Sequence, residues 1–195
     1  MTINLDMFHR GMMMMAMLEK LDQLDYQICR TFNQALQWSS VHRFFGLISR
    51  LGDGPVWYVL MITLPIMAWL TNTTEGYYAS GSLLVSGLAG LMLYRFLKDR
   101  LARERPFIAY HDIDCRHQPL DRYSFPSGHT LHAVMFTTIT VAWFPIMGIV
   151  LVPLTSLIAL SRLVLGLHYP TDVIVGAFIG FGLAQYMLIL LPPLS

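Results

Sequence analysis

The dodecamer "SRLVLGLHYPTD", residues 161–172, joins two long apolar runs and decides both the fold and the chemistry of the chain. The runs cover roughly 146–162 and 171–191, and each is long enough to cross a hydrocarbon core of about 30 Å. Charged groups close to lipid are costly, so they usually have a partner or a function. The sequence therefore predicts two membrane spans joined by a functional turn.

The composition supports this prediction. The 195 residues are 55% hydrophobic and only 13% charged, with a mean hydropathy of +0.52, which is typical of several membrane spans and poor for a soluble domain. A net charge of +1 gives no reason to expect a nucleic-acid partner. Cys29 and Cys115 form neither a CxxC nor a zinc-binding pattern.

Three further apolar stretches lie before residues 146–191 in the chain, at roughly 55–71, 78–95 and 128–144. Because a chain in lipid must satisfy its own backbone hydrogen bonds, five such stretches predict an all-α, polytopic membrane helix bundle with about five transmembrane helices. The sequence "GAFIG", 176–180, spaces two glycines for close contact between helices.

The N-terminal part differs from the rest. Between about 20 and 50, apolar residues at helical spacing alternate with charges, which predicts one or two amphipathic helices lying at the membrane interface. The apolar run 11–18 is too short for a span and no cleavage site follows it, so no signal peptide is expected. We therefore divide the chain into a tail with interfacial helices, 1–50, and a transmembrane catalytic domain, 51–195.

The order of the spans brings distant polar segments to one membrane face. The second span ends near Lys98, the third starts near Ser127, the fourth ends near Arg162 and the fifth starts near Pro170. In a five-span bundle these four ends share a side. Residues of the dodecamer can therefore meet residues of the segment 98–129.

The first polar segment is "KDRLARERP", 98–106. Lys98 and Arg105 are seven residues apart, which is two turns of a helix, so both are expected to project from one side of a helix. Pro106 then turns the chain away. Arg100 and Arg103 are expected to form a basic collar among the lipid headgroups.

The second segment is "PSGHT", 126–130, at the start of a span. Ser127 is a natural N-cap, Gly128 lets a ligand approach the backbone, and free N–H groups at a helix start bind phosphate. His129 falls in the first turn. His132 completes an HxxH pair, but with no acidic partner in the helix it is expected to be a buried, hydrogen-bonded histidine.

The dodecamer supplies the third segment. A carboxylate such as Asp172 near the imidazole of His168 can fix its tautomer and leave the other nitrogen free as a nucleophile. Three cations, an amide-rich helix start, two histidines and a carboxylate together suit phosphoryl transfer, which needs chiefly positioning and charge neutralisation.

In order, these segments are KxxxxxxRP (98–106), PSGH (126–129) and SRxxxxxHxxxD (161–172), spread over about 75 residues. Together they resemble the three-part signature of the type 2 phosphatidic acid phosphatase superfamily, and "LGDGPVWY" before the first span is also similar to members of it. The resemblance implies a helical membrane bundle and a phosphatase that needs no metal or other cofactor. Many bacterial members have six spans, whereas the amphipathic segment here stands in place of the first.

On the matching positions, the resemblance implies three catalytic residues. His168 is the nucleophile that forms a phosphohistidine, Asp172 orients it, and His129 is the general acid. The implied phosphate-binding residues are Lys98, Arg105, Ser127, Gly128 and Arg162. The sequence "HDIDCRHQPLD", 111–121, is then expected to be a loop or a substrate rim in preference to a metal cluster.

The expected function is an integral membrane lipid phosphatase whose substrate diffuses laterally in the bilayer. Undecaprenyl diphosphate is the preferred substrate, because small bacterial relatives of this type often recycle that carrier. Phosphatidylglycerophosphate, phosphatidate and lipid A phosphates stay open, as does a lipid phosphotransferase. Vanadium haloperoxidases have a similar constellation but are soluble, and a transporter would place charges at mid-span, where the last three spans have none.

The expected location is the bacterial inner membrane, but two arguments on orientation conflict. All 13 Lys and Arg residues fall on the active-site side, with only Glu75 opposite, so the positive-inside rule places the site in the cytoplasm. Resemblance to carrier-lipid phosphatases favours the periplasmic side. We expect the periplasmic, extracytoplasmic face.

Overall fold

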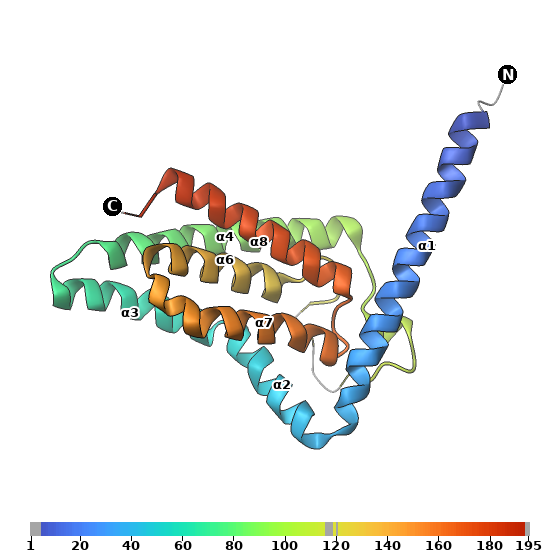
Figure 1. Ribbon diagram of the computed structural model, residues 1–195, viewed down its shortest axis with the longest axis horizontal. Helices are drawn as coiled ribbons and strands as arrows, with labels where there is room; N and C mark the ends of the chain where they lie inside the picture. Colours follow the sequence, from blue (N-terminus) through green and yellow to red (C-terminus); the bar gives the residue numbers. More distant parts are fainter. Residues whose placement is uncertain (1–4, 116–118, 120, 194–195) are drawn as a thin grey trace.

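The computed structural model describes residues 5–115, 119 and 121–193, and within these ranges the chain forms helices and no strands (Figure 1). The all-α prediction is therefore confirmed. In chain order the elements are α1 (Leu5–Asn33), η1 (Gln34–Gln37), α2 (Ser39–Gly52), α3 (Pro55–Thr71), α4 (Glu75–Leu101), α5 (Pro106–Ala109), α6 (Gly128–Trp143), η2 (Pro145–Met147), α7 (Gly148–Val164) and α8 (Pro170–Leu190).

Proline and left-handed residues mark the helix ends. Pro55, Pro106 and Pro170 each lie in the first turn of a helix, where the missing N–H is not needed and the fixed φ fits. Asn72 and Ala102, with φ of 56° and 46°, end α3 and α4 in the left-handed conformation. These local signals mark the start of α3 and α8 and the end of α3 and α4.

Helices α3, α4, α6, α7 and α8 correspond to the five predicted stretches and run side by side in Figure 1. Three described helical segments are long and apolar enough to cross a membrane, and the α2–α3 pair, bent by 44°, adds a fourth if it forms one broken span. Helix α6, with 16 residues, is shorter than a typical span of about 17–25 residues. The chain is a multi-pass membrane protein in which five is an approximate number of spans.

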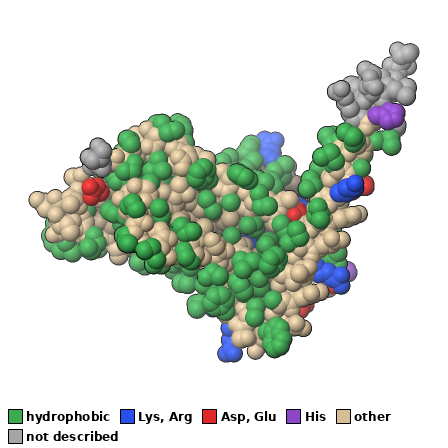
Figure 2. Space-filling model, in the orientation of Figure 1, with side chains coloured by type: hydrophobic (Ala, Val, Ile, Leu, Met, Phe, Trp, Pro, Cys, Tyr) green, Lys and Arg blue, Asp and Glu red, His purple; other side chains and the backbone are tan. Residues whose placement is uncertain are grey.

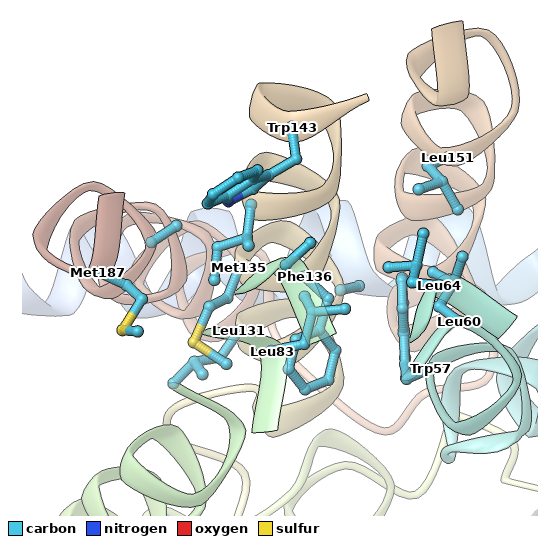
Figure 3. Close-up of a cluster of buried hydrophobic side chains, with 14 of the residues drawn as sticks. Trp57, Leu60, Leu64, Leu83, Leu131, Met135, Phe136, Trp143, Leu151 and Met187 are labelled. Atoms are coloured by element: carbon cyan, nitrogen blue, oxygen red, sulfur yellow. The ribbon is translucent and has the colours of Figure 1, made fainter. Parts of the chain in front are cut away.

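Helix α6 forms the centre of the bundle and packs against α4, α7 and α8. Its side chains meet those of the surrounding helices in one buried cluster (Figure 3), where the rings of Trp57 and Phe136 lie 5.3 Å apart. Hydrophobic side chains also cover the outer sides of the bundle (Figure 2), and Leu84, Ile149 and Phe178 are each more than half exposed. Such a surface suits contact with lipid.

Two glycines bring α6 and α8 into close contact. A Cβ atom at Gly176 would lie 2.6 Å from the carbonyl oxygen of Ser127, and one at Gly180 would lie 2.2 Å from that of Leu131. Both distances are too short for any side chain. The prediction that "GAFIG" packs helices together is confirmed, and this packing fixes the start of α6 against α8.

The N-terminal segment is more ordered than the sequence suggested. Helix α1 is continuous from Leu5, crosses one end of the bundle at a steep angle, and extends well beyond it (Figure 1). Helix α2 packs against α7 and buries Ile48 and Ser49. The segment therefore contacts the bundle directly, while the division into domains at residue 50 stays a prediction.

Candidate active site

A cavity of about 270 Å³ opens at the end of the bundle where α4 ends and α8 begins. Ser127 and Asp172 lie behind its wall and are fully buried. The other six residues that the sequence singled out line the cavity directly: Lys98, Arg105, Gly128, His129, Arg162 and His168. The bundle thus brings together residues that are up to 74 positions apart, from 98 to 172.

Lys98 and Arg105 do not share a helix face, so that prediction was wrong. Helix α4 ends at Leu101, and Arg105 has φ −76° and ψ 152°. The reason is local, because Pro106 excludes the helical conformation from the residue before it. The two cations nevertheless converge, since the chain folds back between them.

Asp121 holds this pair of cations together. Its Oδ1 lies 2.6 Å from Lys98 Nζ and 2.6 Å from Arg105 Nη2. Burial alone would raise the pKa of Asp121, but the hydrogen bond from Lys98 and the charges of Lys98 and Arg105 outweigh it and lower the pKa below its ordinary value. The sequence had placed Asp121 in a loop or rim, and nothing in its spacing indicated this contact.

Arg162 provides the third cation and is almost fully buried. Its Nη1 donates a hydrogen bond to Ser49 Oγ of α2. Its Nε has no hydrogen-bond partner among the described residues. A buried cationic donor without a partner is uncommon in proteins, so this face of the guanidinium is suited to an anion in the cavity.

The start of α6 has the predicted N-cap. Ser127 Oγ accepts a hydrogen bond from Thr130 N at 3.4 Å and lies 3.0 Å from Thr130 Oγ1. The serine hydroxyl is therefore occupied within the helix. The amides of Gly128 and His129 belong to the helix's first turn, where N–H groups have no intrahelical acceptor and can bind phosphate oxygens.

His168 is almost fully buried, and its contacts fix its tautomer. Its Nε2 lies 3.3 Å from Arg105 Nη1. Because arginine can only donate, Nε2 must accept, which places the ring proton on Nδ1. Burial, followed by the charges of Arg105, Arg162 and Lys98, holds the pKa of His168 well below its usual range. The imidazole is neutral, and the Nε2 lone pair points toward the cations and accepts from Arg105.

Asp172 lies on the other side of the His168 ring. Its Oδ2 is 3.6 Å from Nδ1, which is beyond hydrogen-bond distance, and accepts a hydrogen bond from Tyr169 N at 2.9 Å. Active-site contacts of this kind are often long before substrate binds. The carboxylate is close enough for a small shift to complete the contact.

Of the two arginines expected among the headgroups, only Arg100 is exposed. The expectation for Arg103 was wrong, because its guanidinium points inward and lies 2.8 Å from Asp172 Oδ1. Two buried acids, Asp172 and Asp25, bind it instead.

His129 has a different partner from His168. Its Nε2 contacts Asp53 Oδ1, from the turn between α2 and α3. One histidine thus faces a carboxylate and the other faces an arginine, so the two rings have different polar partners. Asp53 lies within the stretch "LGDGPVWY", but nothing in its sequence context indicated a contact with His129.

His132 is half-buried, with Nδ1 2.9 Å from Gly128 O and Nε2 3.2 Å from Gly87 O, as expected of a hydrogen-bonded histidine. Within residues 5–115, 119 and 121–193, no group of three His, Cys, Asp or Glu side chains could hold a metal ion. Part of the 111–121 segment, including His117, lies outside the described residues.

Comparisons with known proteins identify the family of the chain. Residues 79–194 match the model of the PAP2 superfamily. The chain is 28% identical over 148 residues to an undecaprenyl-diphosphatase of Sulfolobus acidocaldarius, covering 74% of this chain and 68% of the relative. It is 40% identical over 133 residues to a decaprenylphosphoryl-5-phosphoribose phosphatase of Mycolicibacterium smegmatis, covering 66% and 67%.

Two solved structures have the same architecture. LpxE of Aquifex aeolicus aligns with a TM-score of 0.71 and 29% identity, covering 84% of this chain and 93% of LpxE. A transmembrane PAP2-type phosphatidylglycerolphosphate phosphatase from Bacillus subtilis aligns with a TM-score of 0.72, covering 95% and 94%. At 21% identity the second likeness shows the fold alone.

Proposed function

Since this chain belongs to the PAP2 superfamily of membrane phosphatases, we propose that it hydrolyses a phosphomonoester or diphosphate of a membrane lipid, with undecaprenyl diphosphate as the preferred substrate. The observation that carries the proposal is the shape of the cavity. Its polar end contains the three cations and both histidines, and its other end is lined by apolar residues of α3 and α4. A lipid phosphate is divided in the same way, into a charged headgroup that suits the polar end and an apolar tail that suits the other end.

The apolar end of the cavity opens toward lipid. Tyr58, Leu84 and Leu88 line the cavity and are also 62%, 56% and 51% exposed on the outside of the bundle. At about 270 Å³ the cavity is smaller than a common ligand pocket of roughly 300–1,000 Å³. The phosphate therefore fits inside while the tail extends between α3 and α4 into the bilayer.

The residues support a two-step reaction. His168 Nε2 attacks phosphorus, the bond from phosphorus to the leaving oxygen breaks, and His129 donates a proton to that oxygen. Water then cleaves the phosphohistidine and gives its proton to His129. Lys98, Arg105 and Arg162 neutralise the oxygens of the transferred group, together with amides at the start of α6 that Ser127 and Gly128 position.

Two of the compared relatives are named for polyprenyl substrates, which favours an isoprenoid lipid over phosphatidylglycerophosphate, phosphatidate or lipid A phosphate. A lipid hydroxyl in place of water in the second step would make the protein a phosphotransferase. Phosphate release in the absence of an acceptor lipid distinguishes the two activities.

Purified protein in detergent is expected to release phosphate from undecaprenyl diphosphate in the presence of EDTA, because three cations supply the charge that a metal would otherwise provide. Vanadate is expected to inhibit by occupying the place of the transferred phosphoryl group. The measurement is phosphate release across a panel of lipid phosphates. Complete loss of activity in EDTA, restored by one divalent ion, would contradict the mechanism and direct attention to the 111–121 segment.

We place the active site on the extracytoplasmic face of a bacterial inner membrane, and single cysteines test this orientation. In a Cys115→Ser background, Arg122→Cys reports the active-site side and Thr73→Cys reports the opposite side, since both positions are exposed. Cys29 can remain, because burial raises the pKa of its thiol to about 12 and leaves it inert. An impermeant thiol reagent should label Arg122→Cys, and not Thr73→Cys, in cells with a permeable outer membrane. The reverse labelling pattern would place the site in the cytoplasm.

A further inference from the structure

Arg103 is a charged residue that the phosphohistidine mechanism leaves without a role. Its Nη1 donates hydrogen bonds to Asp172 Oδ1 at 2.8 Å and to Thr171 Oγ1 at 2.7 Å. Its guanidinium lies 4.1 Å from the centre of the Tyr169 ring, a distance suited to cation–π attraction. Arg103 therefore contacts three of the four residues that follow His168 in the chain, namely Tyr169, Thr171 and Asp172.

The other side of the same guanidinium binds helix α1. Arg103 Nη2 donates to Asp25 Oδ2 at 2.8 Å and to the exposed Asp22 Oδ1 at 3.1 Å. Asp25 is only 3% exposed, and Asp172 is fully buried. Two buried carboxylates would each be costly without a counter-charge, and Arg103 provides it for both.

Helix α1 also holds the backbone around His168. Asp25, Cys29 and Asn33 recur every four residues and so share one face of the helix. Asp25 Oδ1 accepts a hydrogen bond from Thr171 N at 3.0 Å, Cys29 Sγ lies 3.7 Å from His168 O, and Asn33 Nδ2 donates to Val164 O at 3.0 Å. This face of α1 thus contacts the chain before, at and after the proposed nucleophile.

We propose that Arg103 and Asp25 are positioning residues that hold the Asp172 carboxylate in place, so that its Oδ2 faces Nδ1 of His168. The proposal rests on the proposed function, because it assumes that His168 is the nucleophile. Arg103 donates a hydrogen bond to Oδ1 of Asp172, and Oδ2 of the same carboxylate then lies on the side of the His168 imidazole. Without the guanidinium, Oδ1 loses its charged partner and the carboxylate can rotate away from the imidazole.

The N-terminal helix then has a role beyond the membrane interface. It brings Asp25 to the far side of Arg103 and prevents the guanidinium from turning outward to the headgroups. The active site is complete only when α1 is docked on the 163–171 segment.

A double-mutant cycle tests the proposal. Arg103→Gln should lower kcat about 10²-fold with little change in KM, because the nucleophile is misplaced while the phosphate-binding cations remain. In an Asp172→Asn background, the same substitution should cause no further loss, since the carboxylate that Arg103 positions is gone. Asp25→Asn should lower kcat in the same direction by a smaller factor. Arg30→Gln is the matched control, because Arg30 of α1 forms an exposed ion pair with Asp112.

A purely structural role gives different results. The losses from Arg103→Gln and Asp172→Asn would then multiply in the double mutant, and this outcome would overturn the proposal. Arg103→Lys, which keeps the charge, should restore part of kcat, and thermal unfolding in detergent identifies any variant that fails to fold.

Nitrogen NMR of histidine-labelled protein gives a readout that does not depend on turnover. The His168 signal, assigned by its absence in His168→Ala, should show the Nδ1–H tautomer in the wild type and a mixture of tautomers in Arg103→Gln. If the wild type hydrolyses no lipid phosphate, the proposed function fails, and this spectrum still tests the positioning role. An unchanged tautomer in Arg103→Gln would exclude that role.

Discussion

His168→Ala is expected to abolish phosphate release, whereas His129→Ala should retain a measurable rate. The first variant lacks the atom that attacks phosphorus, so no phosphohistidine can form. The second keeps a neutral His168 beside Arg105 Nη1 at 3.3 Å and loses only general-acid catalysis, which contributes a factor of roughly 10² to 10⁴. Rates are measured with purified variants under conditions that saturate the wild type.

The leaving group distinguishes the two roles more sharply than the size of the defect does. A substrate whose leaving oxygen is weakly basic needs no proton, so it should partly restore His129→Ala and leave His168→Ala inactive. Asp53→Asn should resemble a mild form of His129→Ala, because the Asp53 carboxylate contacts His129 Nε2. The assigned roles would be wrong if both alanine variants responded alike across a series of leaving groups.

The sequence was sufficient to predict the parts of the molecule that depend on local patterns. Apolar stretches located α3, α4, α6, α7 and α8, because the thickness of the bilayer sets the length of a span. The parity of those spans placed the three motif segments at one end of the bundle. The N-cap at Ser127 and the packing of "GAFIG" follow from residue type and spacing, and both are present.

The contacts that complete the site could not be predicted, because each joins elements whose relative position depends on tertiary packing. Asp53 reaches His129 only because α2 and α3 bend beside α6, and Ser49 meets Arg162 because α2 packs on α7. Asp121 reaches both Lys98 and Arg105 through a loop without periodicity.

Two errors have identifiable physical causes. The spacing of Lys98 and Arg105 was interpreted as helical, although Pro106 restricts the residue before it to extended backbone. Arg103 was assigned to the headgroups because it follows a span. One signal could have corrected this assignment. Asp25, Cys29 and Asn33 recur every four residues and so form a polar face on an amphipathic helix, which indicates a buried partner for that face.

Arg162→Lys is expected to lower kcat/KM by about 10- to 100-fold, although the charge is retained. Arg162 is 3% exposed, its Nη1 donates to Ser49, and its Nε has no hydrogen-bond partner within the described chain. A planar fork fixed in this way can give an anion directed hydrogen bonds that a lysine ammonium cannot reproduce. Losing one such charged hydrogen bond costs about 1.5–3 kcal/mol.

Vanadate inhibition provides the measurement that isolates this effect, because vanadate has no lipid tail and no leaving group. Its inhibition constant should rise with Arg162→Lys by about the same factor as kcat/KM falls. Arg122→Lys is the matched control, since Arg122 is an exposed cation in the loop beside Asp121. If Arg162→Lys lowered kcat/KM without changing vanadate inhibition, the arginine would act on the lipid or on folding. The phosphate would then be held by Lys98, Arg105 and the start of α6 alone.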